Sequence, residues 1–255
     1  MSSSVSKLQW KLYLMEALGL SIFMISACFF SAILEAKTSF IHVAIPNGFE
    51  RLIIMGVLMG LTALIIFYSP WTSPSGAQIN PAVTLSFLRL GTISKQDALF
   101  YIIFQFIGGT LTVYIMQLLM GVMLTAAPVN SAVTVPGKGV SVFTAGLTEL
   151  LIAFCMIIMI LFTSASNKLK KYTRLFAGLF VCMYVIIAGP ISGFGMNPAR
   201  TFASALPANI WTAFWIYVTA PIAGMLLATE FFIYCTNHKT RLDNITMYKQ
   251  KAAKK

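Results

Sequence analysis

The chain has 255 residues, of which 58% are hydrophobic and 10% are charged, and its mean hydropathy is +0.83. This composition excludes an ordinary soluble domain and is typical of an integral membrane protein. The net charge of +11 would also suit a nucleic-acid-binding protein, but the positions of the basic residues, described below, argue against that class.

Six apolar segments of about 18–25 residues are each long enough to form a membrane-spanning helix. In chain order they lie at about residues 10-34, 50-68, 97-124, 142-164, 173-190 and 210-235. The first is too long for a signal peptide, contains Glu16 and lacks a small-residue cleavage site, so we expect the mature protein to keep it. The sequence therefore predicts an N-terminal segment (1-9), one embedded all-α domain (10-235) and a basic, poorly ordered tail (236-255).

A ten-residue motif occurs twice between these spans, as SGAQINPAVT at 75-84 and SGFGMNPART at 192-201, and the two copies agree at six positions. Each copy places an Asn, Asn80 or Asn197, directly before a Pro. Asn is a favoured N-cap residue and Pro is favoured at the first helical position, so each copy predicts the start of a helix.

The two predicted helices run from Pro81 to about Leu90 and from Pro198 to about Leu206, where Pro207 is expected to end the second. At 1.5 Å per residue each is roughly 14–15 Å long, so only the two end to end would cross the ~30 Å hydrocarbon core. Three full spans separate them. They are therefore expected to enter from opposite faces and to meet near the midplane.

The chain thus divides into two inverted halves, about 10-124 and 142-235, each with a broken helix, which points to a transport site near the midplane. The segments before the short helices, 69-79 and 189-196, are rich in Gly, Pro and Ser. Non-helical backbone is tolerated inside a membrane only where it is buried in protein or lines a water-filled cavity. We expect its carbonyl groups to form a row of hydrogen-bond acceptors.

The basic residues follow the alternation of the spans. Fourteen of the 18 Lys and Arg residues lie before span 1, between spans 2 and 3, between spans 4 and 5, or after span 6, all on one side of a six-span protein. The positive-inside rule then predicts that both termini are cytoplasmic, in a plasma or inner membrane. Membrane topology accounts for the net charge, and no nucleic-acid partner is expected.

The first span of each half carries an acid, Glu16 or Glu149. An ionisable residue inside a membrane is a functional candidate, so the two acids are possible proton carriers. The interpretation we favour is structural: each carboxylate accepts hydrogen bonds from free backbone N–H groups of a re-entrant segment.

The paired Asn-Pro-Ala boxes, the second continuing into Arg200, with six spans, two half-helices and a Glu in spans 1 and 4, resemble the aquaporin and glycerol-channel superfamily over nearly the whole chain. The resemblance implies a homotetramer with one passive pore per subunit and no cofactor. The pore residues it implies in the boxes are Asn80, Pro81, Ala82, Asn197, Pro198 and Ala199. Arg200 would form the narrowest filter and bar protons and cations.

The other filter positions implied by the resemblance depart from the usual water channel. Val185 stands where many water-selective members have a His, and Phe194 stands where small residues or Cys are more usual. Span 2 contributes Met59 or Gly60, depending on loop length, where many members have an aromatic residue. Val185 is expected to widen the constriction and Phe194 to narrow it. The sequence alone does not determine the resulting pore diameter.

Other positions that distinguish the two branches of the superfamily favour water: Thr201, Ala205 and the pair Phe214 and Trp215. The sequence therefore predicts a water channel that excludes protons and ions. One alternative is a channel for small neutral solutes such as glycerol, ammonia or hydrogen peroxide. Another is a poorly conducting structural membrane protein in which Phe194 plugs the pore.

Other function classes lack the residues they need. An enzyme is not expected, because His42, His238, Asp97 and Asp243 form no catalytic cluster near the spans' centre. A secondary transporter would need coupling acids beside the site, whereas the two span acids lie well before the boxes. No metal is expected, since Cys28, Cys155, Cys182 and Cys235 show no ligand spacing and are interpreted as packing residues.

Overall fold

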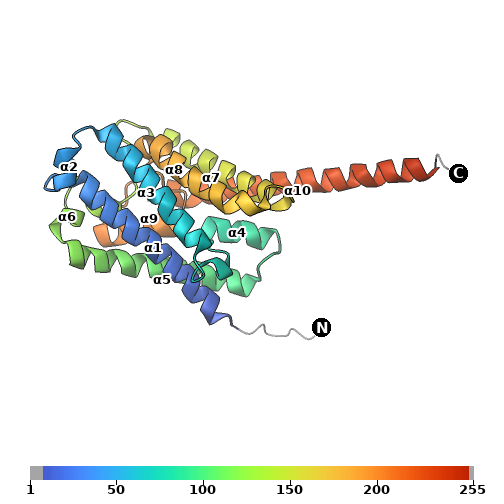
Figure 1. Cartoon of the computed structure of the whole chain (residues 1–255), viewed down its shortest axis with the longest axis horizontal. Helices are drawn as coiled ribbons and strands as arrows, with labels where there is room; N and C mark the ends of the chain where they lie inside the picture. Colours follow the sequence, from blue (N-terminus) through green and yellow to red (C-terminus); the bar gives the residue numbers. More distant parts are fainter. Residues whose placement is uncertain (1–7, 253–255) are drawn as a thin grey trace.

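The computed structural model describes residues 8–252, with side chains described as far as Thr236. The described chain is a bundle of long helices around two short ones (Figure 1). The long helices are α1 (Trp10–Glu35), α3 (Gly48–Tyr68), α5 (Lys95–Met120), α7 (Val142–Ala165), α8 (Thr173–Ser192) and α10 (Phe214–Ala252). The short ones inside the bundle are α4 (Pro81–Arg89) and α9 (Pro198–Ala208).

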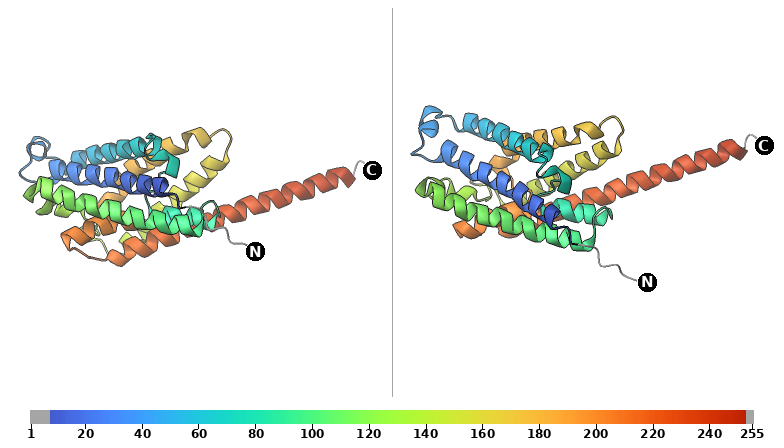
Figure 2. Two further views of the ribbon diagram at one scale, coloured as in Figure 1. Left: turned by 90° about the horizontal axis from the view of Figure 1, so that it is seen from below. Right: turned by 60° about the horizontal axis from the view of Figure 1, so that its bottom comes forward.

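Two further short helices and three 3-10 turns connect these elements. They are α2 (Phe40–Ala44), α6 (Val122–Thr125), Ser73–Ser75, Asn130–Ala132 and Lys170–Tyr172. We call the side where α1 begins and from which α10 projects the terminal side, and the opposite side, where α2 and α6 lie, the distal side (Figures 1 and 2).

Six described helices are long and apolar enough to cross a membrane, which confirms the predicted number of spans. The predicted third span is interrupted at Gly121, whose positive φ of 53° ends α5, and residues 122–125 form the separate helix α6. Glycine adopts this conformation without the Cβ clash that other residues suffer. The predicted sixth span begins four residues late, at Phe214.

The second half-helix differs from its prediction, because α9 continues through Pro207 to Ala208. Proline lacks an N–H and normally ends a helix when it lies in the interior. Here it lies in the last turn, and N–H groups beyond it close that turn: Asn209 donates to the Leu206 carbonyl and Ile210 to the Ala205 carbonyl. Asn209 then ends the helix with a left-handed backbone.

The C-terminal tail also differs from its prediction. Instead of losing order after the last span, α10 continues as one helix to Ala252 and extends beyond the bundle (Figure 2). The apolar pattern that marks the span stops near residue 235, but nothing in the following sequence breaks a helix, since residues 236–252 contain neither Pro nor Gly. Residues 253–255 lie outside the described residues.

Glycines bring the helices of each half together in the same way. A Cβ on Gly108 of α5 would lie 2.5 Å from the Ala17 carbonyl oxygen of α1, and Gly224 of α10 meets the Leu150 carbonyl of α7 in the same manner. Ala17 directly follows Glu16, and Leu150 directly follows Glu149. The two halves therefore share one packing scheme around their acids.

The cysteines divide between packing and exposed positions. Cys28 is fully buried, as a packing residue should be, but Cys155 is exposed on the outer face of α7, so the packing interpretation is wrong for it. A small apolar side chain is tolerated on either face of a membrane helix, which is why the sequence did not separate the two cases.

Candidate pore

The N-termini of the two half-helices lie close together, and two hydrogen bonds link each N-terminal Asn to the loop of the other half. The Asn80 Oδ1 caps α4 by accepting from the Ala82 N–H at 2.9 Å, while its Nδ2 donates to the Met196 carbonyl at 2.9 Å. In the other half, the Asn197 Nδ2 donates to the Ile79 carbonyl at 2.7 Å. Each amide therefore binds the loop of the opposite half.

The Asn197 side chain caps its own helix twice, because its Oδ1 accepts from the N–H groups of Ala199 at 3.0 Å and Arg200 at 3.1 Å. An amide nitrogen carries two hydrogens, and the crossed bonds use one on each Asn. Both Asn side chains also line a cavity, so the second hydrogen of each is available to a molecule inside it.

The acid of the first half is fully buried and holds the loop before α4. The Glu16 carboxylate accepts from the backbone N–H groups of Gln78 at 2.9 Å and Ile79 at 2.6 Å. It also accepts from the Ser75 hydroxyl at 2.6 Å and the Gln105 amide at 2.8 Å. Two backbone donors that no helix could satisfy are thus paired inside the protein.

The acid of the second half repeats the arrangement. The Glu149 carboxylate accepts from the Gly195 N–H at 2.8 Å, from the Met196 N–H and from the Ser192 hydroxyl at 2.6 Å. This is the geometry that a structural role requires. Neither acid lines a described cavity, which is unfavourable for a proton carrier.

The two loops share an unusual backbone. Ala77 and Ile79 have positive φ values of 46° and 44°, and the equivalent Phe194 and Met196 have values of 53° and 46°. Side-chain-bearing residues rarely adopt this conformation and persist in it only where the surroundings impose it. The buried carboxylates impose it here, since their backbone partners lie within these two segments.

Two cavities lie on either side of the loops. The terminal-side cavity has a volume of about 160 Å³ and contains both Asn side chains in its wall. The distal cavity has a volume of about 240 Å³ and is lined mainly by α1, α3, α8 and the segment after α6. Three side chains belong to both linings: Phe23, Phe194 and Arg200. These three therefore lie between the two cavities, and we call them the constriction.

Two cavities with three lining residues in common fit a transmembrane channel, and comparison with known proteins identifies the channel family. The family model for the Major intrinsic protein family matches residues 2–234. The chain belongs to the major intrinsic protein family. Members of this family are membrane channels for water and small solutes rather than enzymes, so the chain is an integral membrane protein.

Named relatives of this major intrinsic protein include plant and archaeal proteins. Aquaporin NIP1-2 of Arabidopsis thaliana is 33% identical over 175 residues, which cover 67% of this chain and 58% of that protein. Aquaporin AqpM of Methanothermobacter thermautotrophicus is 29% identical over 205 residues, covering 77% of this chain and 82% of the relative. The chain thus matches less than two thirds of the length of the first relative.

A solved structure confirms the fold. The aquaglyceroporin from Plasmodium falciparum superposes with a TM-score of 0.71 over 88% of this chain and 95% of its own, at 18% sequence identity. The predicted architecture of six spans and two half-helices is therefore that of the major intrinsic proteins.

The structure separates the expected filter positions of this major intrinsic protein into two levels. Arg200 and Phe194 lie at the constriction, whereas Val185 and Met59 line only the distal cavity. Gly60, the alternative to Met59, lies against α8, since a Cβ there would be 2.7 Å from the Cys182 Cβ. The Tyr184 ring packs against the Phe194 ring, with centroids 6.1 Å apart, and supports it from behind.

Sequence reasoning missed Phe23, which completes the constriction from α1. The signal that marks it is its position seven residues after Glu16, which is two helical turns on the same face. In the second half, Met156 lies seven residues after Glu149 and lines the terminal-side cavity. The acid in each half thus marks the face of its helix that turns toward the pore.

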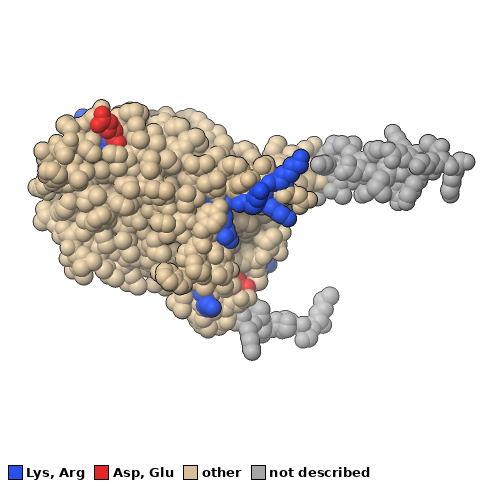
Figure 3. All heavy atoms as spheres, viewed as in Figure 1, with Lys and Arg blue, Asp and Glu red and all other residues tan. Residues whose placement is uncertain are grey.

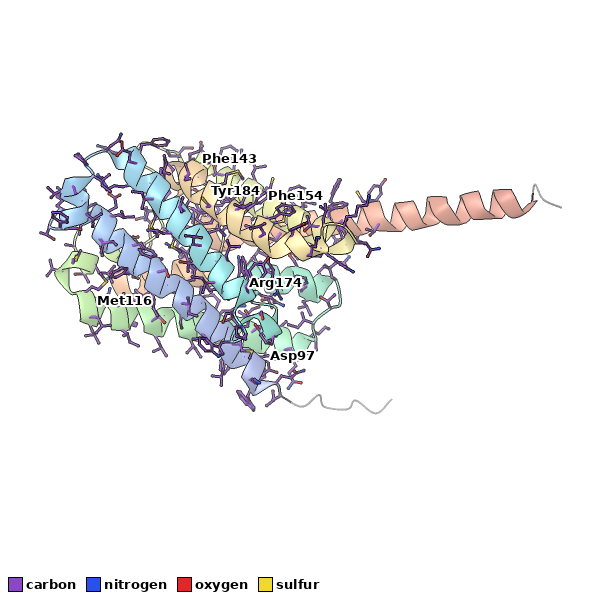
Figure 4. The ribbon with its side chains drawn as sticks, viewed as in Figure 1. Asp97, Met116, Phe143, Phe154, Arg174 and Tyr184 are labelled. Carbon is purple, nitrogen blue, oxygen red and sulfur yellow. The ribbon has the colours of Figure 1, made fainter. Side chains whose placement is uncertain are left out.

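Each mouth of the pore carries a charged side chain. At the distal mouth, Glu35 lines the cavity and forms a bidentate ion pair with the buried Arg51, with both N···O distances 3.1 Å. At the terminal mouth, Arg174 lines the cavity beside α3, with its guanidinium carbon 5.7 Å from the centre of the Tyr68 ring (Figure 4). Neither Glu35 nor Arg174 belongs to the repeated motif.

Proposed function

We propose that this major intrinsic protein is a passive water channel that excludes protons and ions. The single observation that carries the proposal is the constriction of Phe23, Phe194 and Arg200 beside the crossed Asn-Pro-Ala boxes. The constriction would supply a narrow passage and one fixed positive charge. The boxes would supply two amide donors next to it along the path.

The boxes orient a water molecule. The N-termini of α4 and α9 together with the amides of Asn80 and Asn197 present partial positive charge and N–H donors at one point. A water that accepts hydrogen bonds from both amides turns its oxygen toward them and cannot accept from its neighbours. The chain of water-to-water hydrogen bonds is interrupted there, so protons do not pass along it.

The guanidinium of Arg200 adds a full positive charge at the narrowest point. A permanent charge in a low-dielectric passage repels cations strongly, because little solvent screens it. The same side chain donates hydrogen bonds to a passing water. Ile79 and Met196, two apolar residues of the pore loops, line the terminal-side cavity.

A channel for small neutral solutes is the second candidate, and it rests on the composition of the filter. Phe23, Phe194, Val185 and Met59 are all apolar, which leaves Arg200 as the polar group of the constriction. An apolar wall facing one polar side chain suits a solute with a hydrocarbon side and hydroxyl groups on the other, such as glycerol. The two aromatic rings oppose this by narrowing the passage.

For the assembly and orientation, we infer a homotetramer with one pore per subunit and cytoplasmic termini. The orientation is supported by exposed basic side chains that gather on the terminal side (Figure 3). These exposed residues are Arg89, Lys95, Lys168, Lys170, Lys171 and Arg174. A plasma or inner membrane is the proposed location.

Stopped-flow light scattering on proteoliposomes tests the proposal, comparing shrinkage in an impermeant osmolyte with reswelling in glycerol. Wild type is measured beside Phe194→Ala and a matched control, Phe143→Ala, whose ring is 79% exposed at the distal end of α7 (Figure 4). Fast water flux with little glycerol entry supports the water channel, and Phe194→Ala should then admit more glycerol. Comparable glycerol entry in wild type would favour the second candidate. Flux no greater than that of empty vesicles would contradict both.

A further inference from the structure

The pore face of α8 is a stripe of residues that lie one helical turn apart. Ala177, Val181, Val185 and Gly189 follow one another every four residues, and each lines one of the two cavities. Residues at this spacing lie on one face of a helix. Tyr184 directly precedes Val185 and lines neither cavity, so it lies beside the stripe. Its ring therefore belongs to the wall behind the pore surface.

The ring of Tyr184 packs against two other aromatic rings. Its centroid lies 5.4 Å from that of Phe180, one turn earlier on α8, and 6.1 Å from that of Phe194. Tyr184 is only 5% exposed, yet no described residue forms a hydrogen bond with its hydroxyl group. The contribution of Tyr184 is therefore the packing of its ring rather than a hydrogen bond.

Phe194 has a fixed backbone but a side chain that can rotate. The N–H groups of the next two residues, Gly195 and Met196, donate to the buried Glu149 carboxylate and hold this part of the loop. A side chain on a fixed backbone still chooses among several rotamers, and its neighbours decide which one is occupied. Phe194 lines both cavities, and the Tyr184 ring packs against it from outside the pore lining.

We propose that Tyr184 is a positioning residue that holds the Phe194 ring across the passage and so sets the size of the solutes that pass. The inference rests on the proposed channel function, and it adds a residue outside the pore lining to those that determine selectivity. A packed aromatic pair favours one conformer by about twofold to tenfold. Removing the Tyr184 ring also leaves space behind Phe194, into which the Phe194 ring can turn away from the passage.

The test uses three substitutions, Tyr184→Ala, Tyr184→Leu and Tyr184→Phe. Alanine removes the ring, leucine fills part of its space without a ring, and phenylalanine keeps the ring and removes only the hydroxyl. Phe154→Ala is the matched control: Phe154 of α7 also packs against a ring, that of Phe231 at 6.4 Å, but lines neither cavity (Figure 4). Glycerol and water permeabilities are measured in proteoliposomes for each variant, and again in the Phe194→Ala background.

The ratio of glycerol to water permeability is expected to rise about twofold to tenfold in Tyr184→Ala, following the loss of the held conformer. It should rise less in Tyr184→Leu and stay at the wild-type value in Tyr184→Phe and Phe154→Ala. In the Phe194→Ala background, Tyr184→Ala should not change the ratio further, because no ring is left to position.

Three outcomes would overturn the proposal: an unchanged ratio in Tyr184→Ala and Tyr184→Leu, an equal rise in Tyr184→Phe, or a rise that persists in the Phe194→Ala background. If Tyr184→Ala does not fold, Tyr184→Leu decides. A conducting wild type whose ratio is insensitive to these substitutions contradicts only the positioning role. If wild type conducts no water, the proposed function fails, and a Tyr184→Ala variant that is also closed would contradict the positioning role as well.

Discussion

The two pore loops have the same backbone but different side chains. Both are held by a buried glutamate, both have positive φ values at equivalent residues, and both end in a capping Asn whose amide crosses to the other half. Where the second half has Phe194 and Arg200, however, the first has Ala77 and Val83. The scaffold is therefore duplicated, while the constriction takes its loop side chains from the second half alone.

The comparison separates two kinds of residue. Substitutions in the duplicated scaffold should destabilise the protein by similar amounts in both halves, because corresponding backbone hydrogen bonds are lost. Substitutions at the constriction should change permeation when they are made in one half. The same substitution at the matching position of the other half should leave permeation unchanged. Three experiments examine this division.

The largest effect is expected from Glu16→Ala and Glu149→Ala. Each leaves two backbone N–H groups without their acceptor, and a buried unpaired donor costs about 1–3 kcal/mol. We expect each to lower the free energy of unfolding by about 3–5 kcal/mol, measured by thermal unfolding in detergent. The exposed Glu50→Ala is the control. A stable variant in one half only would show that the scaffolds are not equivalent.

The second largest effect is expected from Arg200→Val, which removes the charge at the constriction. The substitution gives the second half the residue that the first half has at the matching position, Val83. Proton and cation leak into vesicles should rise at least about tenfold, since lowering a barrier by about 1.4 kcal/mol has that effect on a rate. A pH-sensitive dye inside the vesicles measures the leak. Val83→Ala, at the matching position, should leave it unchanged. If both variants remain tight to protons, the Asn boxes suffice for exclusion and the Arg barrier is not needed.

The smallest effect is expected on glycerol permeability, in a comparison of Phe23→Ala with Met156→Ala. The two residues occupy equivalent positions on α1 and α7. Phe23 belongs to the constriction, whereas Met156 lines only the terminal-side cavity. Glycerol permeability should rise severalfold in Phe23→Ala and little in Met156→Ala, as measured by reswelling of proteoliposomes. An equal increase in both would place the narrowest point nearer the Asn boxes.

The features that could be predicted from the sequence are those in which a polar or conformationally special residue interrupts an apolar chain. Asn80, Asn197 and the two glutamates stand out for this reason, and their short-range roles follow from unsatisfied backbone groups. The six spans follow from length and hydropathy, which the membrane thickness fixes.

The features that escaped prediction are those in which apolar or common residues are selected by three-dimensional position. Phe23 is one aromatic residue among many in an apolar helix, and only packing shows which of them faces the pore. The choice between Met59 and Gly60 needed the helix rotation that α8 imposes. Tyr184 is one of several aromatic residues of α8, and its contact with Phe194 depends on the fold of the loop after that helix, so it could not be inferred from spacing.

The crossed Asn hydrogen bonds also bear on how the molecule is made. The amide of Asn197 completes the loop of the first half, and the carbonyl of Met196 receives the amide of Asn80, although the bonded residues are 118 and 116 positions apart. The first half therefore leaves the ribosome with its central loop unfinished. The centre of the pore forms only when the second half arrives, which makes it a late event in assembly and places it beyond the reach of either half folding alone.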